Sequence, residues 1–293
     1  MPNVATARCL RGWLFLLVPV LLVPALPGST GALAQTAPGS APALAPVPEI
    51  RPGVLQGYLA RDALPNSLAL IPPPPAANSA AFARDQAFSK RGQAMRGSGR
   101  WTLATSDADL SFPHAAGTFT CALGVSITEQ DAPHLYRLLR RGMTDAGYAT
   151  AAAKDHYQRA RPFMRNRQAT CTPKKEADLR TNGSYPSGHA SIGTAWALIL
   201  SELAPDRADA IEARGRSFGQ SRVVCNVHWE SDVLAGQFIG AATVARLHAD
   251  PVFRAELDAA KAELAAVRSR GKAPEAACAA EAAALALDPP QSP

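Results

Sequence analysis

The sequence lacks the side-chain clusters that commonly bind a metal ion. Its six histidines include no His-x3-His pair, and its five cysteines include no Cys-x2-Cys pair. These spacings are the ones that place two ligands on one metal. No group of carboxylates suggests a metal site either. We therefore expect no metal and no other cofactor.

Basic runs are also missing. The formal net charge is +6, and only 6% of the residues are aromatic. The cations form no continuous block and no stripe interleaved with aromatic side chains, which a nucleic-acid site would favour. We expect no nucleic-acid partner, and we expect some of the cations to serve in a site for a small anion.

The chain has a single long apolar run, Trp13–Leu26, and two prolines interrupt it. The run follows two arginines and precedes the small-residue sequence that ends at Ala34, a pattern typical of a signal peptide. We expect cleavage after Ala34, export to the periplasm or outside a bacterial cell, and no stable membrane insertion afterwards. A permanent amino-terminal anchor is the alternative.

Cysteine is scarce, and Cys9 lies in the segment expected to be removed. The even number that remains permits two disulfides in an oxidising compartment: Cys121, Cys171, Cys225 and Cys278. Three pairings are open, and the sequence does not choose among them. A buried free thiol at Cys225 is the alternative.

Sustained strand alternation and internal repeats are absent, whereas helical periodicity is frequent. We predict an all-α, compact single-domain helical bundle. A capping box at Thr128 and Asp131 predicts a helix through Gly142. Further helices are expected at about 149–161, 189–204, 206–219, 229–248 and 252–269. The expected parts are a signal peptide (1–34), a Pro/Ala-rich linker (35–50), a catalytic domain (51–270) and a flexible tail with a short helix near 276–287 (271–293).

Three short segments contain most of the reactive side chains. They are Lys154–Pro162, Pro186–His189 and Ser221–Asp232. Together they supply cations, two histidines, one carboxylate and one Ser-Gly turn. This set can hold a phosphate and attack it.

The chemistry of phosphoryl transfer requires these residue types. A phosphoryl group in transfer spreads negative charge over three oxygens, so catalysis depends on positioning and electrostatic stabilisation. Arg161 and Arg222 can each grip two oxygens, and Lys154 adds a compact charge. Ser187 and the N–H groups of Gly188 and His189 can form an anion-binding nest at a helix start, listed here as part of the same expected site.

The spacing supports one site. Lys154 and Arg161 are seven positions apart, so on one helix they share a face, and Pro162 would end that helix. His228 and Asp232 are four apart and would also share a face. There the carboxylate can orient the imidazole as a nucleophile or a base.

The pattern Lys-x6-Arg-Pro, Pro-Ser-Gly-His and Ser-Arg-x5-His-x3-Asp resembles the type 2 phosphatidic acid phosphatase and vanadate haloperoxidase superfamily. Flanking residues and the segment Leu68–Pro75 are similar to the bacterial class A non-specific acid phosphatases. The likeness runs from about Tyr58 to about Leu264, every motif position is filled, and it implies the same all-α bundle.

The resemblance implies a role for each matching residue. His228 would attack phosphorus and become a phosphohistidine, Asp232 would orient it, and His189 would protonate the leaving alcohol. The phosphate would be bound by Lys154, Arg161, Ser187, Gly188 and Arg222.

We therefore expect a periplasmic, metal-independent acid phosphatase acting on a broad range of phosphomonoesters, with phosphotransferase activity as an option. A vanadate-dependent haloperoxidase, a lipid phosphatase and a non-catalytic phosphate-binding module are the alternatives. No second membrane span supports the lipid enzyme, and the complete reactive set argues against the binding module. A homodimer or a higher homo-oligomer is left open.

The remaining histidines and one arginine are expected outside the site. Arg159 fits a solvated helix face. Surface or structural roles are expected for His114, His134, His156 and His248.

Overall fold

The computed structural model describes residues 44–271 and 273–288. The predicted signal peptide and most of the predicted linker lie outside the described residues. The helices are α1 (Ser67–Leu70), α2 (Ala80–Ala94), α3 (Gly99–Ser106), α4 (Thr120–Leu123), α5 (Pro133–Tyr148), α6 (Ala151–Tyr157), α7 (Pro162–Asn166), α8 (Glu176–Arg180), α9 (Gly188–Leu203), α10 (Ala208–Val224), α11 (Glu230–Leu247), α12 (Pro251–Arg270) and α13 (Glu275–Leu285). A two-stranded antiparallel hairpin, β1 (Glu49–Arg51) and β2 (Val54–Leu55), precedes them. The all-α prediction is confirmed.

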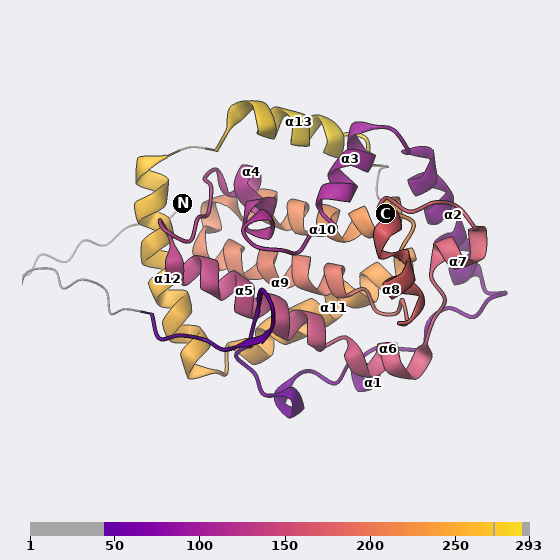
Figure 1. Cartoon of the computed structure of the whole chain (residues 1–293), viewed down its shortest axis with the longest axis horizontal. Coiled ribbons are helices and arrows are strands. Elements are labelled where there is room, and N and C mark those ends of the chain that lie inside the picture. The colour runs from indigo at the N-terminus through magenta and orange to yellow at the C-terminus, as the bar shows by residue number, and fades with distance from the viewer. Residues whose placement is uncertain (1–43, 272, 289–293) are drawn as a thin grey trace, which may run out of the picture. The chain divides into compact units, whose positions relative to one another are not determined.

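Helix α9 lies in the middle of the bundle, with α10 and α11 packed along it and α5 beside it (Figure 1). Its side chains are mostly buried, including Trp196, Ile199 and Leu200. A helix that is apolar on nearly every face must be covered on nearly every face. The sequence therefore places α9 in the core.

Glycines allow α11 to cross α9 closely. A Cβ added at Gly236 would lie 2.3 Å from the carbonyl oxygen of Ser187, and one at Gly240 would lie 2.3 Å from that of Ser191. Any larger residue would push the two helices apart. This close crossing brings the start of α9 next to the start of α11.

Five predicted helices correspond to α5, α9, α10, α11 and α12, but two boundaries were wrong. Thr128 and Asp131 do bond each other, yet the helix begins later, at Pro133, and runs past Gly142 to Tyr148. The predicted helix at 149–161 ends at Tyr157, because Gln158 adopts a left-handed conformation with φ 41°.

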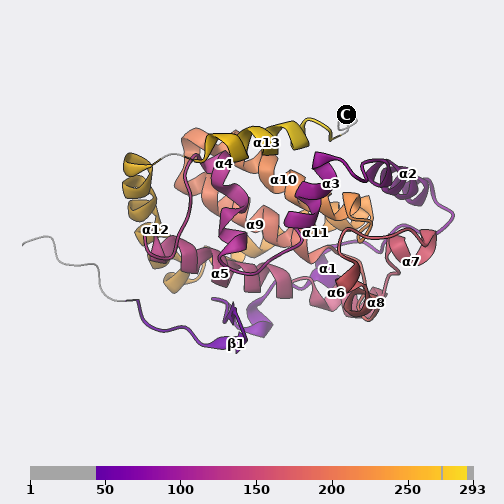
Figure 2. The same cartoon turned by 45° about the horizontal axis from the view of Figure 1, so that its top comes forward.

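The described part of the carboxyl-terminal tail is attached to the bundle, unlike the flexible tail that the sequence suggested. Helix α13 packs against α3 and α4 (Figure 2). A disulfide joins Cys278 of α13 to Cys121 of α4, with Cα atoms 5.2 Å apart. Pairing between distant cysteines cannot be read from a sequence.

Candidate active site

His228 and Asp232 lie where α10 passes into α11. Trp229 caps α11, and Asp232 in the first turn accepts the Trp229 N–H at its Oδ2 over 2.8 Å. The same oxygen lies 3.3 Å from Nδ1 of His228. Both side chains are buried. The pairing predicted from the spacing is present, although His228 precedes the helix instead of lying on it.

The other ring nitrogen of His228 faces a cation. Nε2 lies 3.1 Å from Nη1 of Arg161. A guanidinium can only donate hydrogen bonds, so Nε2 must be the accepting nitrogen and the ring proton must sit on Nδ1, against Asp232. The lone pair of Nε2 therefore points toward the cations.

Lys154 and Arg161 converge by a different route from the predicted shared helix. Lys154 lies in the last turn of α6, whereas Arg161 lies beyond the break at Gln158 and caps α7. Nζ of Lys154 donates to the carbonyl oxygen of Gly183 over 3.0 Å, and Nη2 of Arg161 donates to the same oxygen over 3.4 Å. A Cβ at Gly183 would lie 2.6 Å from the Lys154 carbonyl oxygen, so only glycine fits there.

Neutral acceptors hold Arg161 in place. Its Nε donates to the carbonyl oxygen of Leu179 over 2.8 Å, and its Nη1 donates to that of Val227 over 2.9 Å. Its Nη2 donates to Oδ1 of Asn182 over 2.5 Å. These contacts fix the guanidinium without cancelling its charge.

Arg222 is the least satisfied cation of the group. It lies in the last turn of α10, and its buried Nε and Nη1 have no hydrogen-bond partner. Leaving a buried charged donor unpaired is costly, so such a group normally awaits a ligand.

The three cations share one electrostatic feature. In the part of the chain that the structure describes, no carboxylate oxygen lies within 4.0 Å of a side-chain nitrogen of Lys154, Arg161 or Arg222. Burial lowers the pKa of Lys154 to about 7, and Arg161 lowers it further. Burial also lowers the pKa values of Arg161 and Arg222 to about 10. The cluster therefore carries excess positive charge in a dry environment.

Ser187, Gly188 and His189 form the amino-terminal end of α9. The Ser187 hydroxyl accepts the Ala190 N–H over 3.3 Å, and the Ser187 N–H donates to the backbone carbonyl of Asp232 over 2.8 Å. That backbone bond ties the start of α9 to the start of α11. The helix end with its free N–H groups is a suitable place for an anion.

His189 is oriented by a backbone carbonyl. Its Nε2 lies 3.3 Å from the carbonyl oxygen of Ala108, so Nε2 carries the proton and Nδ1 is left for another partner. The ring stacks on Phe218 at 6.0 Å. Burial lowers the pKa values of both His189 and His228 well below their usual range, and the neighbouring arginines add to the effect.

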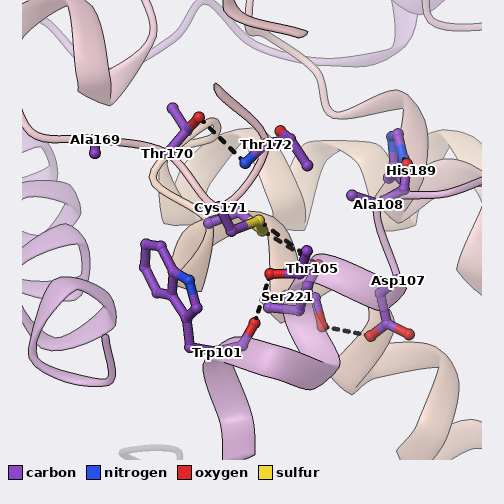
Figure 3. The surroundings of a disulfide bond; sticks show 12 residues. Trp101, Thr105, Asp107, Ala108, Ala169, Thr170, Cys171, Thr172, His189 and Ser221 are labelled. Atoms are coloured by element: carbon purple, nitrogen blue, oxygen red, sulfur yellow. Dashed lines mark hydrogen bonds between the residues drawn. A yellow bond between two sulfur atoms is a disulfide. The ribbon is translucent and has the colours of Figure 1, made fainter. Parts of the chain in front are cut away.

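Figure 3 shows the surroundings of the second disulfide, which joins Cys171 to Cys225 beside α3. Asp107 at the end of α3 is hydrogen-bonded to Ser221, and the next residue, Ala108, faces His189. The disulfide, with Cα atoms 4.7 Å apart, thus joins the loop after α7 to the end of α10 near the site. Cys225 is not a free thiol.

The sequence interpretation missed two residues. Arg159 was expected on a solvated helix face, but its side chain is only 9% exposed and bonds both Asp232 and Asp85. The helix that would have exposed Arg159 ends at Tyr157. Asp85 lies on α2, far from the motifs, and nothing in its local sequence signals this contact.

The described residues contain no group of three or more His, Cys, Asp or Glu side chains that could hold a metal. Within the same residues no helix is both long and apolar enough to cross a membrane. His114, His134 and His248 bond Ser106, Glu256 and Glu202 respectively, away from the cation cluster.

Comparison with known proteins agrees with this site. A family model described as the PAP2 superfamily matches residues 136–255, which include all the candidate residues. A non-specific acid phosphatase of Providencia stuartii is 45% identical over 72% of this chain and 86% of its own length. The chain belongs to the PAP2 superfamily.

Other relatives place it among the acid phosphatases of that superfamily. The non-specific acid phosphatase of Salmonella typhimurium is 44% identical over 68% of this chain and 80% of the relative. The acid phosphatase of Zymomonas mobilis is 40% identical over 71% of this chain and 78% of the relative. The family resemblance predicted from the motifs is confirmed.

Proposed function

We propose that this acid phosphatase hydrolyses phosphomonoesters in two steps through a phosphohistidine at Nε2 of His228. The observation that supports this proposal most is the bond from Arg161 to Nε2, because it requires a bare nitrogen aimed into a cluster of unpaired cations. A bare, oriented imidazole nitrogen is a competent nucleophile. The names of the relatives favour a phosphatase over a haloperoxidase.

The cations would bind the phosphate dianion. Arg222 would donate its unpaired Nε and Nη1, with Arg161 and Lys154 supplying further charge. The hydroxyl of Ser187 already accepts a backbone N–H, so its own proton is available to a phosphate oxygen. The N–H groups of Gly188 and His189 complete the anion site.

In the first step, Nε2 of His228 attacks phosphorus and the ester P–O bond breaks. Asp232 accepts the hydrogen bond from Nδ1–H and stabilises the positive charge that develops on the ring. His189 donates a proton from Nδ1 to the leaving alkoxide, so the alcohol departs neutral. The bound dianion favours the protonated form of His189 that this step needs.

In the second step, a water molecule attacks the phosphohistidine. The now neutral His189 takes a proton from that water, the P–N bond breaks, and inorganic phosphate is released with Nε2 bare again. If another alcohol replaces water, the same step transfers the phosphoryl group. Because all proposed contacts are to the phosphate, many different alcohols would be accepted as leaving groups.

We also propose export to the periplasm or the cell exterior. The two disulfides suit an oxidising compartment. The apolar amino-terminal run that motivates export lies outside the described residues.

The intermediate can be tested by trapping. Acid-quenched and alkali-quenched samples of enzyme mixed with p-nitrophenyl phosphate should show a phosphoenzyme that is labile in acid and stable in alkali. His228→Ala should abolish both the phosphoenzyme and turnover, whereas the matched variant of a distant histidine, His248→Ala, should retain both. Wild-type turnover in His228→Ala would refute the nucleophile.

A further inference from the structure

Arg159 joins two buried carboxylates beside the proposed nucleophile. Its Nη1 donates to Oδ1 of Asp232 over 2.5 Å and to the hydroxyl of Ser231 over 2.8 Å. Its Nη2 donates to Oδ2 of Asp85 over 2.7 Å. Asp85 and Asp232 are 1% and 0% exposed, so water does little to screen these charges.

Asp85 holds the same end of α11 by further bonds. Its Oδ1 accepts the backbone N–H of Ser231 over 2.8 Å, and its Oδ2 accepts the Ser231 hydroxyl over 2.7 Å. The network thus connects α2, the loop between α6 and α7, and the first turn of α11. A network whose polar groups are paired holds its members in one geometry.

The two oxygens of Asp232 have different partners. Oδ2 faces Nδ1 of His228 and the Trp229 N–H, whereas Oδ1 faces Arg159. The His228–Asp232 pair can attack while it holds one proton, on Nδ1. A second proton on either group would remove the bare Nε2 or the negative charge that orients the ring. The two groups therefore titrate together.

Several other charged or titratable groups face this pair from the surrounding elements. They come from α2, α6, α9, α10 and the loops at 161 and 185, and they are Asp85, Lys154, His189, Arg222, Arg161 and Tyr185. The three cations among them oppose a second proton in the empty site. A bound phosphate dianion would cancel much of their charge, whereas both terminal nitrogens of Arg159 are already bonded to carboxylates.

We propose that Arg159 is a positioning residue for the nucleophile. By bridging Asp85 and Asp232 it holds the carboxylate against His228 and keeps a second proton off the pair at acid pH with substrate bound. This inference rests on the proposed function of His228. Without Arg159 two buried carboxylates would face each other with no cation between them, and like charges favour protonation.

The test compares charge with packing. The rate of the first turnover of p-nitrophenyl phosphate is measured against pH for the wild type, Arg159→Gln, Arg159→Lys and Asp85→Asn. Arg254→Gln, an exposed arginine on α12, is the matched control. Circular dichroism confirms the folded fraction of each variant at each pH.

Removing the positive charge should move the acid limb of the profile to higher pH. We expect a shift of about one unit or more in Arg159→Gln, which is about a tenfold additional loss of rate for each unit on that limb. Arg159→Lys should keep the limb near its wild-type position. Asp85→Asn removes a negative charge and should move the limb to lower pH, and Arg254→Gln should match the wild type. A uniform loss of rate in Arg159→Gln with an unmoved limb, or equal shifts in the Gln and Lys variants, would overturn the proposal.

A second readout does not depend on turnover. The ¹⁵N spectrum of the His228 ring, assigned with His228→Asn, reports which nitrogen carries the proton. The form with Nδ1 protonated and Nε2 bare should persist to lower pH in the wild type than in Arg159→Gln. If both proteins lose it at the same pH, the proposal is wrong. If wild-type enzyme does not hydrolyse phosphomonoesters, the proposed function fails while this spectrum still decides the role of Arg159.

Discussion

Two groups of buried arginines lie along α10, and they differ in their partners. Arg222, at the end of the helix, has no carboxylate beside it and two unpaired donors. Arg214, earlier in the helix, is equally buried but bonds both oxygens of Asp107, at 2.5 and 3.2 Å, and Glu281 at 3.2 Å. Burial alone therefore does not distinguish an arginine that binds ligand from one that holds the fold.

The charge balance makes the same distinction. Burial lowers the pKa of Arg222 to about 10. Burial acts in the same direction on Arg214, but Asp107 and Glu281 reverse it and the pKa of Arg214 is raised. Arg100 resembles Arg214, since its Nε bonds Asp288 at 2.6 Å. One group is incomplete without an anion, and the other contains its own.

The paired group also connects the tail to the site. Glu281 and Asp288 come from α13 and the residues after it, and Asp107 bonds Ser221, the residue before Arg222. The Cys121–Cys278 disulfide holds the same tail. The paired arginines thus stabilise the end of α10 from which the unpaired one projects.

Replacing the unpaired arginine should affect activity most. Arg222→Gln should lower kcat/KM by about 10³-fold, the size expected for a lost donor to transition-state charge. The phosphate-free protein should unfold at an equal or higher temperature, because a buried unpaired charge is removed. Kinetics and thermal unfolding measure the two effects, with exposed Arg216→Gln on the same helix as the control. A large fall in Tm without phosphate would contradict the distinction.

Breaking the paired group should affect stability most. Asp107→Ala leaves Arg214 without its main counterion, and removal of one partner from a buried pair costs about 3–5 kcal/mol. Urea unfolding would measure this loss in free energy. Asp109→Asn, an exposed carboxylate nearby, should cost far less. Equal losses in the two variants would show that the Asp107 pair does not stabilise the fold.

Lys154 should leave a smaller, pH-dependent signature. Its pKa is about 7 in the folded protein against an ordinary 10.5, so between these values the unfolded chain binds more protons. The free energy of unfolding contributed by Lys154 should therefore rise with pH across this window. The difference between wild type and Lys154→Met in phosphate-free buffer measures it. A difference that stays constant from pH 7 to 10 would show that Lys154 is not desolvated in this way.

Removing divalent metals should have the smallest effect. If protein cations supply the positive charge, excess EDTA should leave the phosphatase rate essentially unchanged. Dialysis against the chelator followed by assay, with and without added Mg²⁺ or Zn²⁺, is sufficient. A large loss that a divalent ion restores would contradict the charge assignment.

The comparison of the two groups also shows what the sequence could predict. The motif residues are close in sequence or fall into ordered segments, so Lys154, His228 and Asp232 could be assigned to one site, and helical periodicity predicted the main helices. The path between Lys154 and Arg161 could not be predicted, because one left-handed residue, Gln158, redirects the chain.

Contacts between distant segments were equally inaccessible. Arg159 and Asp85 meet only because α2 packs against the start of α11, and an arginine beside a helix-like segment fits a solvated surface just as well. The pairing of Cys121 with Cys278 likewise depends on where α13 docks. A sequence pattern reports local conformation and residue chemistry, whereas such partners are selected by tertiary packing.

The most direct test of the unpaired cations is a crystal structure of the protein with orthovanadate, an analogue of the phosphoryl group in transfer. The account predicts vanadium bonded to Nε2 of His228, with oxygens accepting hydrogen bonds from Nε and Nη1 of Arg222 and from Lys154, while Arg214 keeps its bonds to Asp107. Vanadate bound elsewhere, or bound with the Arg222 donors still unpaired, would contradict it.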